Sequence, residues 1–296
     1  PIRFGNLCNQ KCVMCSPTFS NQWYDEWEGF FGKATQGQGP RIQIKRADDG
    51  KKWIKPEEFT WYEHPVWWEK LDQMAPHLRH IYVTGGEPMV TPAHDKMLDR
   101  LIELGHAKNI WLEYDTNLTA INPRITDRWK HFKLVEIAFS IDDVAERFEY
   151  QRSNAVWTEV CDNIQKFREL RKRCKNIRLQ VCCTVNVFNV YYLETVAQWI
   201  VKQQFDYIYW NIMHDAWYFS VASLPDTAKS VITDRLINAD VLEKVSAEFK
   251  LIAEFMNKGA STDGAIMRMR IADLDRKRSQ HLSMVEPEFA KLVDYV

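Results

Sequence analysis

The chain has 296 residues, of which 46% are hydrophobic, 13% aromatic and 27% charged, and its 39 Lys and Arg residues nearly balance 40 Asp and Glu residues, for a formal net charge of −1. This composition excludes a disordered tail, a collagen-like chain and a polybasic nucleic-acid-binding protein. No run approaches the ~18 uninterrupted apolar residues of a membrane span, and the first residues show no basic segment followed by an apolar run. We therefore expect a soluble, cytoplasmic protein that binds neither membranes nor nucleic acid.

Short runs rich in β-branched and aromatic residues alternate with longer segments of helical periodicity. The predicted strands are Ile2–Asn6, His80–Thr84, Asn109–Tyr114, Leu134–Ser140, Ile177–Val185 and Asp206–Ile212. The predicted helices are Phe19–Phe31, Pro65–Met74, Pro92–Leu104, Asn154–Arg173, Val190–Gln203 and Ala239–Asn257. Repeated strand–helix units predict an α/β fold with a parallel sheet, and their even spacing favours a partial (β/α)6 barrel of the TIM type over an open sheet. In such barrels the functional residues lie at the C-terminal ends of the strands.

The distribution of glycine and charge suggests how this fold is divided. Five of the 11 glycines, together with Pro40 and a run of mixed charges, fall within residues 29–56, which we interpret as an inserted loop. We predict a core barrel over residues 1–215, including this insertion, and a helical C-terminal extension over residues 216–296.

Three of the seven cysteines stand within eight residues, at Cys8, Cys12 and Cys15, directly after the first predicted strand. A tight cysteine cluster in a reducing compartment is more often a metal or catalytic site than a crosslink. Zinc is one candidate, but a closed structural zinc site needs four ligands, and the nearest histidine is His64. Three thiolates suit a [4Fe–4S] cluster with one iron left open for a further ligand.

A second motif, Thr84-Gly85-Gly86-Glu87-Pro88, follows the second predicted strand. Two glycines let the backbone approach a ligand closely, and a glutamate can accept hydrogen bonds from an ammonium group. The same five residues are also compatible with an ordinary tight turn.

Together the two motifs resemble the radical S-adenosylmethionine (radical SAM) superfamily, which has a three-cysteine loop after its first strand and a Gly-Gly-Glu motif after its second. Further segments resemble its twitch domain-containing branch, and the resemblance covers roughly residues 1 to 215. These segments are Ile2–Cys8, Tyr82–Pro88, Tyr114–Leu118, Phe139–Asp143 and Phe148–Arg152. Members of that branch often carry a cysteine-bearing segment upstream of the barrel, so the start at Pro1 suggests a shortened chain.

The resemblance implies roles for individual residues. Cys8, Cys12 and Cys15 would ligate three irons of a [4Fe–4S] cluster, whose fourth iron chelates the amino and carboxylate groups of SAM. Gly85, Gly86 and Glu87 would hold the SAM ammonium.

Further cofactor contacts are implied after later strands. Ser140 and Asp142 would bond the ribose hydroxyls or the methionyl part, with an ordinary strand-end turn as the alternative. Arg152 would bind the SAM carboxylate, unless it is a solvated arginine at a helix start. Asn117 would line the cofactor pocket, and Val185 would present backbone groups to the adenine.

The resemblance also implies the reaction. A low-potential electron donor of the flavodoxin or ferredoxin type would reduce the cluster, SAM would be cleaved to a 5′-deoxyadenosyl radical, and the radical would take hydrogen from a peptide or a small metabolite or nucleotide. His214, Tyr114 and Asp115, at strand ends, are the candidates to face this substrate, and a purely structural hydrogen bond is their alternative. The competing hypothesis is a non-catalytic iron–sulfur or zinc module that acts as a scaffold or electron carrier.

Overall fold

The computed structural model describes residues 1–31, 44–46, 48–50, 52–53, 60–214 and 216–295. The predicted insertion at residues 29–56 lies largely outside them. In its described part, β2 (Lys45–Arg46) and β3 (Lys52–Trp53) pair antiparallel. No described helix is both long and apolar enough to cross a membrane.

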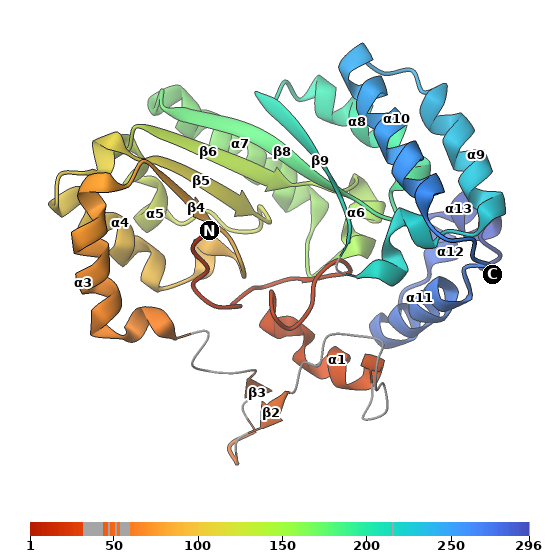
Figure 1. Cartoon of the computed structure of the whole chain (residues 1–296), viewed down its shortest axis with the longest axis horizontal. Coiled ribbons are helices and arrows are strands. Elements are labelled where there is room, and N and C mark those ends of the chain that lie inside the picture. Colours follow the sequence, from red (N-terminus) through yellow and green to blue (C-terminus); the bar gives the residue numbers. More distant parts are fainter. Residues whose placement is uncertain (32–43, 47, 51, 54–59, 215, 296) are drawn as a thin grey trace. The chain divides into compact units, whose positions relative to one another are not determined.

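The central sheet has five strands in the order β4-β5-β6-β8-β9 (Figure 1). Their bounds are β4 His80–Val83, β5 Trp111–Thr116, β6 Leu134–Ser140, β8 Ile177–Val185 and β9 Tyr207–Ile212. The strands β4, β5 and β6 pair in parallel, with Tyr82 opposite Glu113 and Glu113 opposite Glu136. The parallel α/β fold predicted from the strand–helix alternation is therefore confirmed, and β6 and β8 have the predicted bounds.

The first predicted strand, Ile2–Asn6, is reduced to one parallel bridge between Ile2 and Val83. The Ile2 amide donates to the Tyr82 carbonyl at 2.7 Å, and the Ile2 carbonyl accepts from Thr84 at 3.0 Å. Gly5 then has a φ of +89°, a left-handed conformation that ends the extended backbone. The prediction of a sixth regular strand was wrong for this reason.

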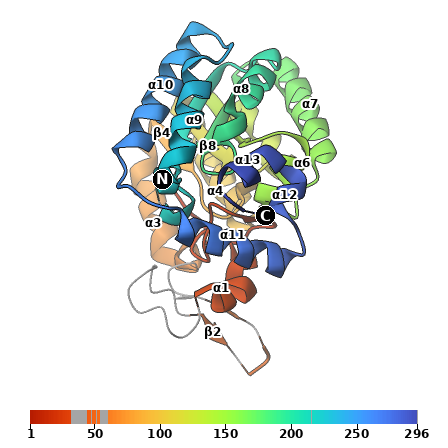
Figure 2. The ribbon, with the colours of Figure 1, turned by 90° about the vertical axis from the view of Figure 1, so that its right-hand side faces the viewer.

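Helices connect the strands and make up most of the C-terminal part (Figures 1 and 2). Their bounds are α1 Tyr24–Phe31, α3 Pro65–Met74, α4 Ala93–Glu103, α5 Pro123–Thr126, α6 Ala145–Gln151, α7 Trp157–Arg173, α8 Leu193–Lys202, α9 Asp226–Ile237, α10 Glu243–Lys258, α11 Ala265–Arg278, α12 Leu282–Val285 and α13 Pro287–Leu292. Two further short strands are β1 Lys11–Cys12 and β7 Arg152–Ser153.

The chain separates into two compact units. The first comprises Pro1–Lys11, Cys15–Ser140 and Asn154–Gln180, and the second comprises Cys12–Met14, Ile141–Ser153 and Val181–Val296. The boundary after residue 215 that the sequence suggested stays a prediction.

In the first unit, alternate residues of β5 and β6 form a core against helices. The rings of Phe139 and Phe167 lie 5.1 Å apart, and those of Tyr114 and Trp129 lie 5.5 Å apart, all four side chains being buried. The intervening residues of β5, such as Glu113 and Asp115, are only half-buried. One face of this part of the sheet is therefore a packed core, and the other is polar and partly accessible.

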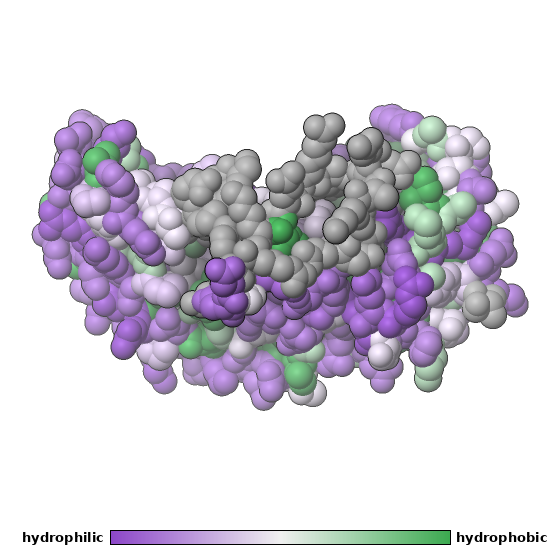
Figure 3. Space-filling model, turned by 90° about the horizontal axis from the view of Figure 1, so that it is seen from below, coloured by the Kyte–Doolittle hydropathy of each residue, from purple (hydrophilic) through white to green (hydrophobic). Residues whose placement is uncertain are grey.

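In the second unit, α9 and α10 lie side by side in both ribbon views (Figures 1 and 2). The edge strand β9 packs against α10 through Trp210 and Phe249, whose rings are 5.7 Å apart. On the side of the molecule seen in Figure 3, hydrophobic residues form small groups among a mainly hydrophilic surface. The described residues from Asp226 onward are mostly helical, in α9 to α13. A separate C-terminal extension over residues 216–296 stays a prediction.

Candidate functional site

In the first unit, the loop after β4 is bonded to the segment that carries Cys8. The amide of Glu87 donates to the Leu7 carbonyl at 2.8 Å, and the amide of Gly86 donates to the Phe19 carbonyl at 3.1 Å. Gly86 has a φ of +61°, and a Cβ there would lie 2.3 Å from the Leu7 carbonyl oxygen. Gly85 has a φ of +79°, and its Cβ would meet the Arg3 side chain. Both glycines of the motif are therefore required by backbone conformation and by close approach.

The Glu87 carboxylate is directed into the protein. Its side chain is 1% exposed and accepts hydrogen bonds from the amide of Met89 at 3.0 Å, the hydroxyl of Thr116 at 2.9 Å and the amide of Asn117 at 2.7 Å. Burial raises the pKa of Glu87 to about 7, against the lowering effect of these three donors. In this structure Glu87 joins the loops that follow β4 and β5.

Asn117 lies beside the sulfur of Cys8. Its Nδ2 is 3.7 Å from Cys8 Sγ and 2.9 Å from Asn9 Oδ1, while its own Oδ1 accepts from the Thr119 amide at 3.0 Å. The side chain of Asn117 thus bridges the cysteine segment and the loop after β5, which is where the sequence placed it.

Tyr114 and Asp115 are neighbours in β5 and point to opposite faces. Asp115 accepts a hydrogen bond from Thr84 Oγ1 at 3.2 Å and a very short one from the Tyr82 hydroxyl, on the half-buried polar face. Tyr114 is 0% exposed, and burial raises its pKa. Of the two substrate-facing candidates in β5, the structure places only Asp115 on the accessible face.

The Tyr114 hydroxyl lies 2.9 Å from Nε2 of His94, a buried residue that the sequence analysis did not single out. His94 Nδ1 lies 3.1 Å from the Pro88 carbonyl, which can only accept, so Nδ1 carries the proton and Nε2 accepts from Tyr114. Burial lowers the pKa of His94 to about 4. The position of His94 at the start of α4, six residues after Pro88 of the Gly-Gly-Glu motif, was the available sequence signal.

In the second unit, Arg152 and Asp142 form a buried ion pair. Arg152 Nε and Nη2 lie 2.7 and 2.6 Å from Asp142 Oδ2, and the third nitrogen, Nη1, lies 3.7 Å from Cys12 Sγ. Asp142 is 0% exposed, and its other oxygen accepts from the Thr184 amide at 2.7 Å. The structure brings Asp142, Arg152 and Cys12 together, and occupies both carboxylate oxygens of Asp142 within the protein.

Gln151 is a second residue that sequence reasoning missed. Its carbonyl accepts from the Val13 amide at 2.8 Å, between two of the clustered cysteines, and its buried side chain contacts Asp143 and Asn186 at 3.2 and 3.0 Å. Its place directly before Arg152 in a segment that matched the family was the signal.

Three further predicted site residues, Ser140, Val185 and His214, lie at or just after strand ends. Ser140 is half-buried at the end of β6. Val185 is 0% exposed, and its carbonyl accepts from the Met213 amide at 3.0 Å. His214 is exposed, and its ring packs 5.3 Å from that of Phe255 in α10.

All seven cysteines are free of disulfides. Among the residues that the structure describes, no three or more His, Cys, Asp and Glu side chains are gathered in an arrangement that could hold a metal ion. The donor set nevertheless fits an iron–sulfur cluster chemically, because three reduced thiols stand on one short segment and two of their sulfurs face N–H donors.

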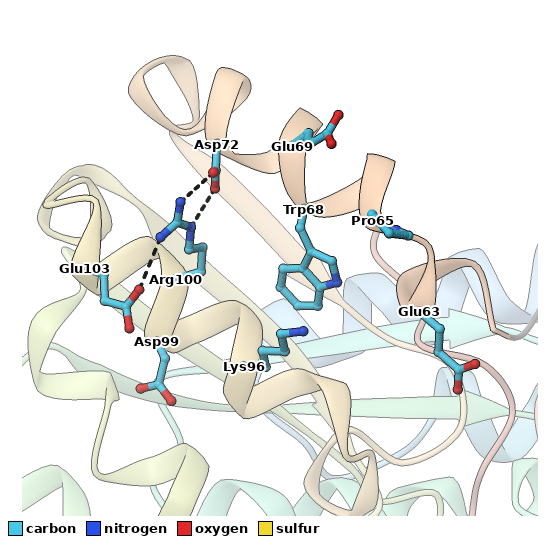
Figure 4. A pocket seen from close by; sticks show the side chains of 9 residues that line it. All are labelled: Glu63, Pro65, Trp68, Glu69, Asp72, Lys96, Asp99, Arg100 and Glu103. Carbon is cyan, nitrogen blue, oxygen red and sulfur yellow. Dashed lines mark hydrogen bonds and ion pairs between the residues drawn. The ribbon is translucent and has the colours of Figure 1, made fainter.

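A groove of about 650 Å³ lies between α3 and α4 (Figure 4). It is lined by Glu63, Pro65, Trp68, Glu69, Asp72, Lys96, Asp99, Arg100 and Glu103. The Arg100 guanidinium is paired with Asp72 at 2.7 and 2.5 Å, and Lys96 Nζ lies 4.2 Å from the centre of the Trp68 ring. Within the groove Arg100 pairs with both Asp72 and Glu103, and none of the predicted site residues lines it.

A family model of the radical SAM superfamily matches residues 2–181. The chain belongs to the radical SAM superfamily. The members of this superfamily are enzymes whose cofactors are S-adenosylmethionine and a [4Fe–4S] cluster, and membership assigns both cofactors to this chain. The sequence expectation of the superfamily and of its two cofactors is thereby confirmed.

Several solved structures are similar to this radical SAM chain. Native anSMEcpe with bound AdoMet matches with a TM-score of 0.50 and 15% identity, over 88% of this chain and 64% of that one. TsrM from Kitasatospora setae, a methyltransferase with cobalamin and a [4Fe–4S] cluster, has a TM-score of 0.39 and 9% identity, over 80% and 50%. SuiB from Streptococcus suis, bound to the precursor peptide SuiA, has a TM-score of 0.34 and 13% identity, over 74% and 50%.

The chain spans less than two thirds of the length of each of these three proteins. At 15% identity the likeness to anSMEcpe shows the fold alone. No curated protein matches the chain.

Proposed function

We propose that this protein is a radical SAM enzyme in which Cys8, Cys12 and Cys15 ligate a [4Fe–4S] cluster. When bound, the reduced cluster and SAM supply a 5′-deoxyadenosyl radical, which takes a hydrogen atom from a peptide or a small metabolite or nucleotide. The observation that carries the proposal is the bonding of the Gly85–Glu87 loop to the segment that bears Cys8, with the Asn117 side chain at the Cys8 sulfur. We further propose that residues 1–215 form a partial (β/α)6 barrel of the twitch domain-containing branch, with the bridge between Ile2 and Val83 in the place of a sixth regular strand.

The protein's own residues bind and orient the cofactors in this proposal. In this proposal, backbone groups of Gly85 and Gly86 hold the SAM ammonium. A Cβ at either position would clash with Arg3 or Leu7, so only glycine lets this loop pack against the cysteine segment. Glu87 fixes this loop from the buried side through its three accepted hydrogen bonds. Ser140 and Val185 lie at strand ends where the ribose and adenine are expected.

Asp115 is the substrate-facing residue that the structure favours. It lies on the half-buried polar face of β5 and is held by Tyr82 and Thr84. A carboxylate there can accept a hydrogen bond from a hydroxyl, amide or ammonium group of a substrate. His214 is exposed and its ring packs on Phe255, so we propose for it an orienting contact with the substrate and no proton transfer. The electron donor we propose is of the flavodoxin or ferredoxin type.

The test is anaerobic reconstitution of the whole chain with iron and sulfide, followed by incubation with SAM and dithionite. We expect about four irons per chain and release of 5′-deoxyadenosine. The Cys12→Ser variant should lose both, whereas Cys161→Ser, which changes a half-buried cysteine of α7, should keep both. A fully loaded cluster without any 5′-deoxyadenosine would contradict the proposal and favour a non-catalytic iron–sulfur module.

A further inference from the structure

Two of the clustered cysteine sulfurs each lie next to a side-chain N–H donor. Nη1 of Arg152 is 3.7 Å from Cys12 Sγ, and Nδ2 of Asn117 is 3.7 Å from Cys8 Sγ. These distances are ordinary for hydrogen bonds to sulfur, whose acceptor radius is larger than that of oxygen. The two donors come from different parts of the sequence, so the two sulfur contacts are independent observations.

The Arg152 donor is fixed in direction. Its Nε and Nη2 are held by one oxygen of Asp142, and only Nη1 is left on the side of Cys12. Asp142 itself is held by the Thr184 amide at its second oxygen and by Asn189 Nδ2 at its carbonyl, at 2.7 and 2.9 Å. The Arg152 side chain is only 6% exposed, so its charge acts on the sulfur with little screening by water.

The Asn117 donor is fixed as well. Its Oδ1 accepts from the amide and the hydroxyl of Thr119 at 3.0 and 2.6 Å, which determines which end of the amide group faces Cys8. Its backbone amide donates to Glu87. Asn117 is therefore held by its side chain at the cysteine segment and by its backbone at the buried glutamate, and the residue is 7% exposed.

We propose that Arg152 and Asn117 are positioning residues that raise the reduction potential of the cluster by donating N–H groups to the Cys12 and Cys8 thiolates. The inference rests on the proposed function. Reduction adds one electron from an external low-potential donor to the cluster, with no bond made or broken, so negative charge on its sulfurs increases. Hydrogen bonds to the sulfurs and a buried cation nearby stabilise the reduced state more than the oxidised one. This assigns Arg152 a role besides the SAM carboxylate contact, since Asp142 already takes two of its nitrogens.

The experiment is a potentiometric titration of the reconstituted whole chain without SAM, followed by electron paramagnetic resonance of the reduced cluster. Asn117→Leu keeps the approximate size of the side chain and removes the N–H donor without adding a charge beside the sulfurs. The double variant Asp142→Asn with Arg152→Met removes the ion pair as a unit, so that no lone carboxylate stays buried. We expect each variant to lower the equilibrium constant for reduction at least tenfold, which is about 59 mV for a one-electron couple.

The neighbouring ion pair of Arg147 and Asp143 offers a matched control. Arg147 lies in α6 and Asp143 lies just before it, and the distance from Arg147 Nε to Asp143 Oδ1 is 2.9 Å. The double variant Asp143→Asn with Arg147→Met likewise removes an ion pair. The described hydrogen bonds of Asp143 come from Val144, Arg147 and Gln151 rather than from a donor to the sulfurs, so this variant should keep the parent potential. Arg152→Lys, which keeps the charge but not the planar fork, should shift the potential less than the double variant.

Parent potentials in both Asn117→Leu and the Asp142–Arg152 double variant, with full iron content, would overturn the proposal. Loss of iron from both variants with intact secondary structure would overturn it too, because the donors would then serve cluster assembly. These results differ from failure of the proposed function, in which the parent chain itself binds no cluster or releases no 5′-deoxyadenosine.

Discussion

The carboxylate of Glu87 accepts a 2.7 Å hydrogen bond from the backbone amide of Asn117, which joins the loop after β4 to the loop after β5. This bond fixes the position of Asn117, whose side chain lies beside Cys8, relative to the glutamate of the Gly-Gly-Glu motif. The site residues of the first unit are thus coupled through a buried carboxyl group.

Glu87→Gln is expected to cost about 1–3 kcal/mol of unfolding free energy at pH 5, because the amide nitrogen must face one of three donors. Since the pKa of Glu87 is raised from 4.5 to about 7, folding favours its protonated form. Its contribution to stability is therefore present below pH 4.5 and is lost as the pH rises through 7, by roughly 3 kcal/mol at most. Gln stays neutral, so the deficit of the variant should shrink towards pH 8.

Urea unfolding of both proteins from pH 4.5 to 8 measures this difference. Glu103→Gln, a change in a side chain that is 65% exposed, is the control and should follow the parent at every pH. Parallel curves for Glu87→Gln and the parent would show that folding does not raise the pKa of Glu87.

His94→Gln should change the pH dependence in the opposite sense. Folding disfavours protonated His94, whose pKa is lowered from 6.5 to about 4 by burial. The parent therefore loses stability as the pH falls from 6.5 towards 4, and the variant should gain on the parent over the same range. Urea midpoints at pH 4.5, 5.5 and 7 measure the gain, and a constant difference between the two proteins would refute it.

Tyr114→Phe should destabilise the fold by about 1–3 kcal/mol, because it leaves the buried Nε2 of His94 without its donor. Tyr209→Phe removes a hydroxyl from a side chain that is 52% exposed and should have little effect. Because Tyr114 lies on the helix-covered face, release of 5′-deoxyadenosine per bound cluster should equal that of the parent. A lower yield of 5′-deoxyadenosine at equal iron content would indicate that Tyr114 takes part in the reaction.

Gly86→Ala should be far more harmful than Gly105→Ala. Both glycines have a positive φ, +61° and +73°, so both substitutions carry a similar backbone strain of about 1–2 kcal/mol. Only at Gly86 does the new Cβ meet backbone, 2.3 Å from the Leu7 carbonyl oxygen, whereas nothing lies within 4 Å at Gly105. Iron content and urea midpoints should separate the two variants, and equal losses would show that strain alone matters.

Arg152→Met alone should cost about 3–5 kcal/mol, because Asp142 is fully buried and would lose its counter-ion. The double variant with Asp142→Asn should be more stable than Arg152→Met, since a neutral amide is easier to bury. A thermal-unfolding double-mutant cycle measures the coupling. Additive effects of the two single changes would mean that the ion pair contributes no coupling.

The positions of the strands of the central sheet could be predicted from the sequence. β6 and β8 have the expected bounds. The strand prediction failed at Ile2–Asn6. The residue pattern there is typical of a strand, but the positive φ of Gly5 turns the backbone. The charged stretch Arg268–Arg278 has the composition of a solvated helix face, yet Arg270 and Asp275 of α11 are buried. A composition of charges does not show which of them find partners inside the fold.

For the candidate site, the motifs located the residues but not the direction of their side chains. Glu87 and Asp142 were predicted from resemblance to face the cofactor, and both carboxylates are bonded within the protein. Residue type and spacing determine the chemical class of a ligand. Whether a carboxylate turns inward depends on donors distant in sequence, such as Thr184 and Asn117, which only the folded chain brings near.

The alternation of Tyr114 and Asp115 along β5 also protects the pairing of that strand with its neighbours. A slip of one residue would carry the Asp115 carboxylate into the apolar layer beside Trp129 and His94, and would expose the Tyr114 ring. Burying a carboxylate away from its partners costs several kcal/mol, so the misaligned sheet is strongly disfavoured. The polar residue on the accessible face thereby helps the chain to fold in only one register.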